Sequence, residues 1–401
     1  MVYAHLLNES AIPIWGLTSR QRILRVLKDL PAANVVDDVG AVPADHTVLL
    51  LRGDYLYDDR LLNYLIQTPG KMLNITGEQG PMIVAAHVPS GQAQQSSDAM
   101  RSAAPAPDCP GLSADTLETL SLSFQEHLRK VERPFVLPVT PDNRRELERR
   151  LFDWSYKGVT DLVTKWAWPL PARWAVGQCV RFGLRPNHVT IVGLLLVILA
   201  GVLFAFGQYG WGLLAGWLMT FLDTVDGKLA RVTVTSSRFG HYFDHIIDIV
   251  HPPIWYVLWG LGLGTAHLGS AAIALSPVLW AVFIAYTAGR LVEGTFQWTL
   301  GRFGIFCWRP LDSYFRLVTA RRNPNMIFLT LATLGGRPDL GLLAVAFWTV
   351  STTLFLMIRL ALGGYVHFSR GPLRSWLKDV DQPRYNGSLA VRLFTRSTSD
   401  N

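Results

Sequence analysis

Charged residues are scarce in this sequence. Asp, Glu, Lys and Arg make up 17% of its 401 residues, whereas about a quarter of a soluble protein is usually charged. The shortage is uneven along the chain. Roughly the first 155 residues have an ordinary soluble composition, and long apolar runs dominate from about residue 188. The sequence therefore predicts a soluble part followed by a membrane part.

Cysteine is also scarce. Cys109, Cys179 and Cys307 lie far apart and form no CxxC pair, which excludes a disulfide framework and a structural zinc site. The net charge of +7 comes from basic residues beside apolar runs, and there is no zinc-finger or recognition-helix pattern. These features favour a membrane and anionic lipid headgroups over nucleic acid as the partner. No signal-peptide pattern opens the chain, so we expect the first domain in the cytosol.

Residues 1–88 of the predicted first domain, 1–155, alternate apolar runs with helix-like stretches. This alternation predicts a cytosolic α/β domain with a mostly parallel sheet. The Pro, Ser, Gln, Gly and Ala of residues 89–112 predict a loop. The other predicted elements are strands at Thr47–Leu51 and Met82–His87 and helices at Ser19–Leu30 and Leu117–Val131.

Residues 188–370 contain six apolar stretches, which we interpret as six transmembrane helices. Residues 156–187, where Trp alternates with Lys and Arg, predict an interfacial helix, and residues 371–401 form a tail. The positive-inside rule places both termini and the site described below on the cytosolic face of the cell membrane. The predicted spans are Val189–Phe206, Trp211–Leu222, Phe239–Leu263, Ala271–Ala288, Met326–Leu334 and Leu340–Ile358.

Four carboxylates lie in or beside these apolar stretches, where an uncompensated charge costs several kcal/mol. Asp223 and Asp226 are three residues apart, and Asp244 and Asp248 are four apart, so each pair shares one helix face. Converging carboxylates repel one another unless cations intervene, and all-oxygen ligation suits Mg²⁺ or Mn²⁺. The spacing predicts a site for two divalent ions. The alternative is a set of structural ion pairs with neighbouring basic residues.

The pattern Asp-x2-Asp-Gly-x2-Ala-Arg-x8-Gly-x3-Asp-x3-Asp, from Asp223 to Asp248, resembles the signature of the class I CDP-alcohol phosphotransferases, at every fixed position. The resemblance implies that Asp223, Asp226 and Asp244 hold the metals, joined by Asp248, which also acts as the general base. It further implies a homodimer that moves a phospho-alcohol group from a CDP-linked donor, such as CDP-diacylglycerol, to an acceptor alcohol in phospholipid biosynthesis, releasing CMP. The CMP-binding residues implied are Asn187, Thr190, Asp226, Gly227, Ala230, Arg231 and Gly240.

Two further features concern the acceptor and the first domain. Arg290, Arg321 and Arg322 lie at predicted cytosolic helix ends and either grip a phosphorylated acceptor or anchor the helices. Trp15–Arg22 and Leu51–Asp54 resemble parts of a nucleotidyltransferase domain, but the Gly-rich loop is absent, so we expect a degenerate domain. The alternatives are a bifunctional enzyme with an active cytidylyltransferase, or a non-enzymatic membrane protein that binds ions. Transporters commonly carry internal repeats, which the sequence lacks.

Overall fold

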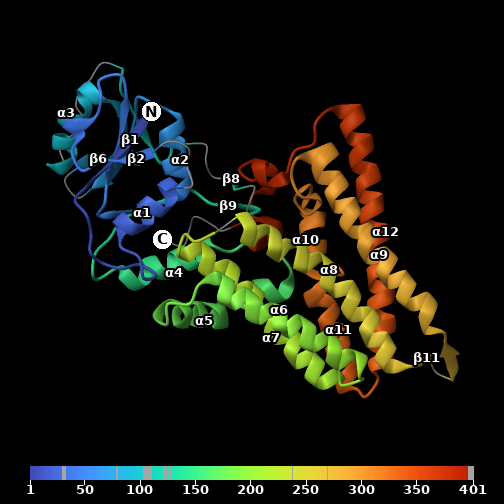
Figure 1. Ribbon diagram of the computed structural model, residues 1–401. Helices are drawn as coiled ribbons and strands as arrows, with labels where there is room; N and C mark the ends of the chain where they lie inside the picture. The colour runs from blue at the N-terminus through green and yellow to red at the C-terminus, as the bar shows by residue number, and fades with distance from the viewer. Residues whose placement is uncertain are drawn as a thin grey trace.

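The computed structural model describes residues 1–28, 33–77, 80–102, 111–120, 124–125, 128–236, 238–268 and 270–395, except the side chains of residues 33, 124–125 and 238–245. Figure 1 shows a sheet-containing domain joined to a body of long helices. The hairpin of β11 (Ala266–Leu268) and β12 (Ala271–Ile273) lies at the end of the helices remote from the sheet.

Within the described ranges, the first domain is built on a six-stranded sheet of order β2-β1-β3-β6-β5-β7. Strand β1 pairs in parallel with β2 and β3, but β6 pairs antiparallel with both β3 and β5. Strand β5 pairs in parallel with β7, so three of the five pairings in the described sheet are parallel and two are antiparallel. The sheet is mixed, with the predicted majority of parallel pairs. The strands are β1 Val2–Leu7, β2 Ala33–Val35, β3 Thr47–Arg52, β5 Lys71–Gly77, β6 Gly80–Pro89 and β7 Ser113–Thr116.

Helices cover both faces of this sheet because side chains alternate along each strand. Leu49 and Leu51 of β3 pack with helices α1 and α2, and Val48 and Leu50 pack with α3. The predicted loop at 89–112 is wrong, since α3 lies there; the predicted helix at 117–131 is also wrong, since strands β8 and β9 lie there. The remaining elements are α1 Ser19–Lys28, α2 Asp59–Gln67, α3 Ser90–Arg101, α4 Arg144–Trp154, β4 Tyr55–Tyr57, β8 Phe124–Gln125, β9 Lys130–Val131 and β10 Val136–Pro138.

A helix lies at each of the six predicted spans in the described part of the chain. They are α6 Pro186–Ala205, α7 Tyr209–Val232, α8 Arg238–Leu263, α9 Leu275–Thr295, α11 Arg322–Leu334 and α12 Pro338–Arg370. Helix α8 runs through Pro252 and Pro253. Helix α9 begins four residues later than predicted, because Ala271–Ile273 pairs as a strand.

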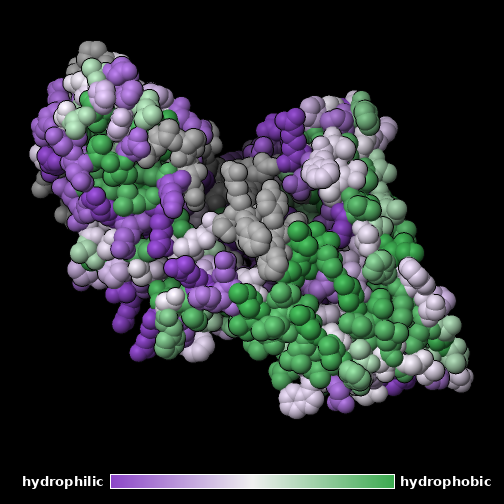
Figure 2. Space-filling view, viewed as in Figure 1, coloured by the Kyte–Doolittle hydropathy of each residue, from purple (hydrophilic) through white to green (hydrophobic). Residues whose placement is uncertain are grey.

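Among the described residues, four segments are long and apolar enough to cross a membrane: Pro186–Ala205, Ile246–Leu263, Leu275–Gly301 and Pro338–Arg370. Helix α11 has 13 residues, fewer than the 20 or so that a crossing needs. Figure 2 shows hydrophobic residues gathered over the long helices and hydrophilic ones over the sheet domain. Large exposed apolar side chains on the helices include Ile191, Leu195, Ile284 and Phe347. Such a surface marks an integral membrane protein.

Two hydrogen bonds from α1 reach the C-terminal end of α7. Arg22 Nη2 of α1 donates to the carbonyl of Val232 at 2.5 Å, and Arg25 Nη1 donates to that of Thr233 at 2.6 Å. These carbonyls end α7, so the two arginines satisfy acceptors that a helix leaves free at its C-terminus.

The segment after α12 returns to the helical body. Ser375 Oγ donates to the Cys307 carbonyl, and Trp376 Nε1 donates to Ser313 Oγ. After α12 the chain forms the 3-10 helix η5 Trp376–Asp379 and helix α13 Leu389–Phe394. Other elements of the helical body precede α12. They are the π-helices η2 Val163–Ala167 and η3 Phe296–Gly301, the 3-10 helix η4 Ile305–Cys307, and helices α5 Pro169–Arg181 and α10 Pro310–Val318.

Candidate functional site

The acidic motif lies at the ends of α7 and α8 nearest the sheet domain. Asp223 and Asp226 lie near the C-terminal end of α7, and Asp248 lies in the N-terminal half of α8. Asp244 is also in α8, but its side chain is outside the described residues, as is the setting of Gly240. The chain turns between the two helices, which brings acids 25 residues apart in sequence into one region.

A guanidinium joins the two helices at this site. Arg322, at the start of α11, donates from Nη2 to Asp223 Oδ2 at 2.5 Å and from Nη1 to Asp248 Oδ1 at 2.6 Å. Charge-assisted bonds of this length are strong. A position for positive charge between the two carboxylates is therefore part of the fold.

Asp226 has a different partner. Its carboxylate is buried and accepts a hydrogen bond from Thr190 Oγ1 of α6 at 2.7 Å. Thr190, predicted to line the CMP site, orients the Asp226 carboxylate through this bond. One turn of helix separates Asp223 from Gly227, and a Cβ at Gly227 would lie 3.1 Å from Arg231 Nη2. The glycine thus leaves room for the Arg231 guanidinium.

The residues present fit a divalent cation by their chemistry. The described residues hold no ready-made group of three or more His, Cys, Asp or Glu side chains around one point. The carboxylates of Asp223 and Asp248 nevertheless face a common cation, which here is the Arg322 guanidinium. Oxygen-only donors of this kind match the preference of Mg²⁺ and Mn²⁺.

The carboxylates open onto a polar cavity of about 410 Å³. Arg290, Arg321 and Arg322, predicted to bind the acceptor, all line it. The motif residues that line it with them are Asp223, Gly227, Arg231 and Asp248. Asn187 lines a different cavity, of about 460 Å³, beside Trp15 and Gly16. Thr190, Asp226 and Ala230 line neither of these cavities.

Several cavity residues were missed from the sequence. Arg129, Lys157 and Asp161 precede the membrane helices, and Arg316 and Asn323 follow α9. Glu293 bonds to both Arg290 and Arg321 and so holds these two arginines together. No local motif marks these positions, because only the tertiary fold brings them to the acidic motif.

Asp161 joins several residues that line one side of the cavity. Its carboxylate accepts bonds from the Thr164 N–H and from Asn323 Nδ2, both at 3.0 Å, and lies 3.9 Å from Arg316 Nη2. Burial alone would raise the pKa of Asp161, but the Arg316 charge and these hydrogen bonds outweigh it and lower the pKa below its usual value. Asp161 is therefore ionised at neutral pH.

Lys228 also lines the cavity. Its buried Nζ donates to the Ser155 carbonyl at 3.0 Å and lies 3.3 Å from the centre of the Tyr156 ring. Its ammonium is thus committed to the segment that leads into the membrane helices.

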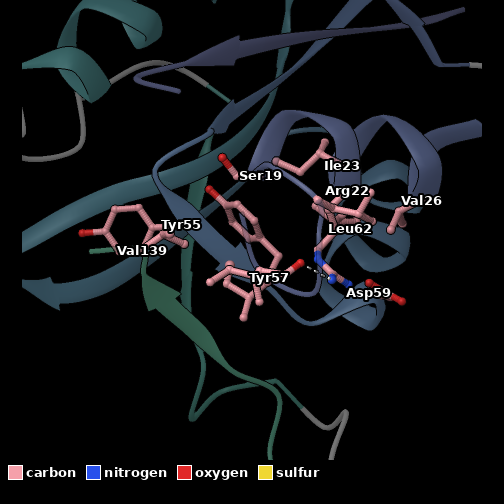
Figure 3. Close-up of a pocket in the computed structure, with 12 residues that line it drawn as sticks. Ser19, Arg22, Ile23, Val26, Tyr55, Tyr57, Asp59, Leu62 and Val139 are labelled. Atoms are coloured by element: carbon pink, nitrogen blue, oxygen red, sulfur yellow. Dashed lines mark hydrogen bonds between the residues drawn. The ribbon is translucent and has the colours of Figure 1, made fainter. Parts of the chain in front are cut away.

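A separate pocket lies inside the sheet domain. Figure 3 shows Arg22, Tyr57 and Asp59 around it, with Ile23 and Leu62 adding apolar walls. Its volume of about 10 Å³ is roughly the space of one water molecule. It is too small for a nucleotide.

Residues 184–304 match the family model described as CDP-alcohol phosphatidyltransferase. A Rubrobacter xylanophilus protein named bifunctional IPC transferase and DIPP synthase is 27% identical over 205 residues, 51% of this chain and 44% of its own. The archaetidylinositol phosphate synthase of Pyrococcus horikoshii is 38% identical over 85 residues, 20% of this chain and 43% of its own. The phosphatidylinositol phosphate synthase of Mycobacteroides abscessus is 33% identical over 114 residues, which are 28% of this chain and 52% of that protein. The chain spans about half the length of these relatives.

Proposed function

We propose that this chain, whose residues 184–304 form a CDP-alcohol phosphatidyltransferase domain, is a membrane transferase of phospholipid biosynthesis. It moves a phosphatidyl or other phospho-alcohol group from a CDP-alcohol, such as CDP-diacylglycerol, to an acceptor alcohol and releases CMP. The observation that carries this proposal is the cavity where Asp223 and Asp248 meet Arg231 and the three predicted acceptor arginines. Carboxylates and guanidinium groups around one polar cavity suit phosphoryl chemistry.

The acceptor hydroxyl attacks the phosphorus that bears the donor's alcohol. Asp248 takes the proton of that hydroxyl, a new P–O bond forms, and the P–O bond to the CMP phosphate breaks, so CMP leaves with the electron pair. Two divalent ions held by Asp223, Asp226, Asp244 and Asp248 would neutralise the diphosphate and the charge on departing CMP. Thr190 keeps Asp226 in place through its 2.7 Å bond.

The donor occupies the end of the cavity near the motif. Gly227 leaves the space beside α7 open, and Arg231 supplies charge for the diphosphate. Ala230, Asn187 and Gly240 stay predicted CMP contacts, although Ala230 and Asn187 do not line this cavity. The exposed apolar faces of the long helices suit a donor whose alcohol carries acyl chains, because such a donor stays in the bilayer while its headgroup reacts.

The acceptor carries a phosphate group of its own. Of the described residues that line the cavity, eight are basic and four are acidic. Buried positive charge in excess is costly unless an anion binds. Two relatives are named as synthases of phosphatidylinositol phosphate and archaetidylinositol phosphate. Inositol phosphate is therefore the first acceptor to test, and glycerol phosphate the second.

The six helices α6, α7, α8, α9, α11 and α12 form the membrane domain in the cell membrane, and the short α11 needs flanking residues to complete its crossing. Both termini and the cavity face the cytosol, where CDP-linked donors and phosphorylated alcohols are found. Helix α5 lies in the interface, consistent with the exposure of Trp174 and Leu170. The active form is a homodimer.

The first domain is a degenerate nucleotidyltransferase. Asp54, at the strand end that resembles a catalytic Gly-Asp, is bonded to Arg52 through both oxygens at 3.0 and 2.6 Å. The Gly-rich loop that would hold a triphosphate is absent from the sequence. A bifunctional enzyme is the second candidate, because one relative is named bifunctional. CTP-dependent release of pyrophosphate by the full chain would support that candidate and contradict the degenerate domain.

The test of the main proposal is CMP release. Full-length protein in lipid nanodiscs is given CDP-diacylglycerol, Mg²⁺ and a panel of alcohols with and without phosphate. We expect CMP from the wild type, and a fall of about 100-fold or more for Asp248→Asn. Asp142→Asn, at an exposed position, is the matched control and retains activity. A folded wild type that releases no CMP with any donor and acceptor would contradict the proposal.

A further inference from the structure

Two basic residues of the catalytic cavity come from outside the matched domain. Arg129 lies between β8 and β9 of the first domain, and Lys157 follows α4; both precede residue 184, where the family match begins. Each lines the same cavity as Asp223 and Asp248. Lys157 is exposed to the cavity and Arg129 is half-buried. Their positions extend the site beyond the family domain.

The backbone of these two residues is fixed in one clasp, formed by residues 128–131 and 157–159. The Gly158 N–H donates to the Leu128 carbonyl at 2.9 Å, and the Val159 N–H donates to the Arg129 carbonyl at 3.2 Å. A Cβ at Gly158 would lie 2.6 Å from the carbonyl oxygens of both Arg129 and Phe394. Only glycine allows this close approach. The clasp therefore holds the Arg129 and Lys157 side chains at the cavity on a rigid support.

The charges around the clasp are mostly of one sign. Arg129, Arg231 and Arg316 place positive charge near Lys157, and the negative charge of Asp248 reduces the resulting repulsion in part. Arg316 is buried, its Nε and Nη1 have no hydrogen-bond partner in the described part of the chain, and its paired acid Asp161 is 3.9 Å away. Buried, unsatisfied guanidinium donors are costly in the absence of an anion.

We propose that Arg129 and Lys157, with Arg316, bind the phosphate monoester of the acceptor. The inference rests on the proposed function and extends it, because it makes the segments before the membrane domain part of the acceptor site. The donor diphosphate has Arg231 and the cations at the acidic motif as its partners. A second phosphate needs cations of its own, and those of the clasp act on the same space as Asp248, beside which the acceptor hydroxyl must lie.

The experiment compares Arg129→Ala, Lys157→Ala and the wild type in nanodiscs, with Arg133→Ala as the matched control. Arg133 is exposed, close in sequence to Arg129 and not part of the cavity lining. The KM for inositol phosphate and that for CDP-diacylglycerol are measured separately by CMP release. The Kd for inorganic phosphate is measured by calorimetry without turnover. Circular dichroism and size-exclusion chromatography check that each variant is folded.

Loss of one charge-assisted hydrogen bond is expected to raise the KM for the phosphorylated acceptor and the Kd for phosphate about tenfold. The KM for the donor is expected to change less than about twofold, and Arg133→Ala is expected to behave as the wild type. An equal rise in the donor KM would overturn the inference by assigning the clasp to the diphosphate. Unchanged KM and Kd values would overturn it as well.

The inference and the proposed function can fail separately. If the wild type releases no CMP with any acceptor, the proposed function fails, and the Kd for phosphate decides the clasp alone. A Kd that rises in Lys157→Ala then supports a phosphate site at the clasp, and an unchanged Kd overturns it.

Discussion

Arg322 Nη1 lies 2.6 Å from Asp248 Oδ1, so a residue of α11 neutralises the predicted general base on α8. The same guanidinium bonds to Asp223 on α7, and thus three helices meet at one positive charge. A cation at this point offsets the repulsion between two carboxylates. The relationship suggests how the site remains stable before metal and substrate bind.

Replacing Arg322 by Ala tests this role. Without the guanidinium, Asp223 and Asp248 repel each other, and Mg²⁺ becomes the cation that stabilises them. We expect Mg²⁺ to raise the Tm of Arg322→Ala by about 2 °C or more beyond the rise seen for the wild type. The comparison is a thermal unfolding series with Mg²⁺ and with EDTA.

The control is Arg337→Ala, which removes an arginine paired with Asp339 at 2.8 Å, outside the cavity lining. Its response to Mg²⁺ is expected to match that of the wild type. Equal Mg²⁺ responses for all three proteins would contradict the view that Arg322 occupies the place of a cation.

The contact between α1 and α7 predicts a second effect. Burial lowers the pKa of Arg22 to about 10, so this guanidinium is still charged at neutral pH and bonds to Val232. Changing Arg22 or Arg25 to Met leaves a terminal carbonyl of α7 without its partner, at a cost of about 1–3 kcal/mol. A lower midpoint of thermal unfolding is expected for each variant.

Arg20 provides the control on the same helix. It is paired with Glu9 and Asp37 near the surface, and such pairs contribute about 0–1 kcal/mol. Arg20→Met is therefore expected to unfold close to the wild-type midpoint. If Arg20→Met and Arg22→Met lose the same stability, the capping of α7 by α1 has no special role.

A buried ion pair inside the helical body gives a third prediction. Arg359 of α12 donates to both oxygens of Asp312 on α10, at 2.6 and 2.8 Å. Arg359→Met leaves a buried carboxylate unpaired and is expected to cost about 3–5 kcal/mol. The double variant Arg359→Met with Asp312→Leu removes both charges and is expected to regain much of the loss.

Denaturant or thermal unfolding of the two variants measures this difference. Arg384→Met, which breaks an exposed pair with Asp379, serves as the control with little expected change. A double variant less stable than Arg359→Met alone would show that the loss is one of packing rather than of an unpaired charge.

The helical body shows what the sequence could predict. The length of the apolar stretches predicts where the helices lie, and the helical spacing of the acids predicts that Asp223 and Asp248 lie close together. Both predictions depend only on local periodicity. The positions of Arg290, Arg321 and Arg322 at helix ends mark them as candidates for the site, and all three line the cavity. In the part of the chain that the structure describes, four segments rather than six meet the length and hydropathy of a span, because α11 is short and α7 carries the charges of the motif.

The sheet domain was predicted less well. Strands β5 and β6 are separated by two residues between Gly77 and Gly80, a spacing typical of a hairpin that would have indicated antiparallel pairing. The polar Ser and Gln residues of α3 favour a loop when the sequence is considered alone, although Ala93 and Met100 bury one face of the helix. Arg129 and Lys157 could not be assigned, since their approach to the cavity depends on contacts between distant segments.

The lowered pKa of Asp161 gives a prediction for pH. A depressed folded-state pKa stabilises the protein above the unfolded value, about 3.9, and this stability is lost as pH falls through the folded-state pKa. The difference in Tm between the wild type and Asp161→Asn is expected to be constant above about pH 5 and to shrink below about pH 4. Thermal unfolding across pH 3–7 measures this difference. A difference that stays constant through the acidic range would contradict the ionised Asp161 at the cavity wall.

The most direct test of the proposed chemistry is the product balance of one reaction. Full-length protein in nanodiscs is incubated with CDP-diacylglycerol, inositol phosphate and Mg²⁺, and both CMP and the new phospholipid are measured by mass spectrometry. We expect equal amounts of CMP and phosphatidylinositol phosphate from the wild type, and neither from Asp248→Asn. CMP without a new lipid, or a new lipid formed equally by Asp248→Asn, would contradict transfer to an alcohol activated by Asp248.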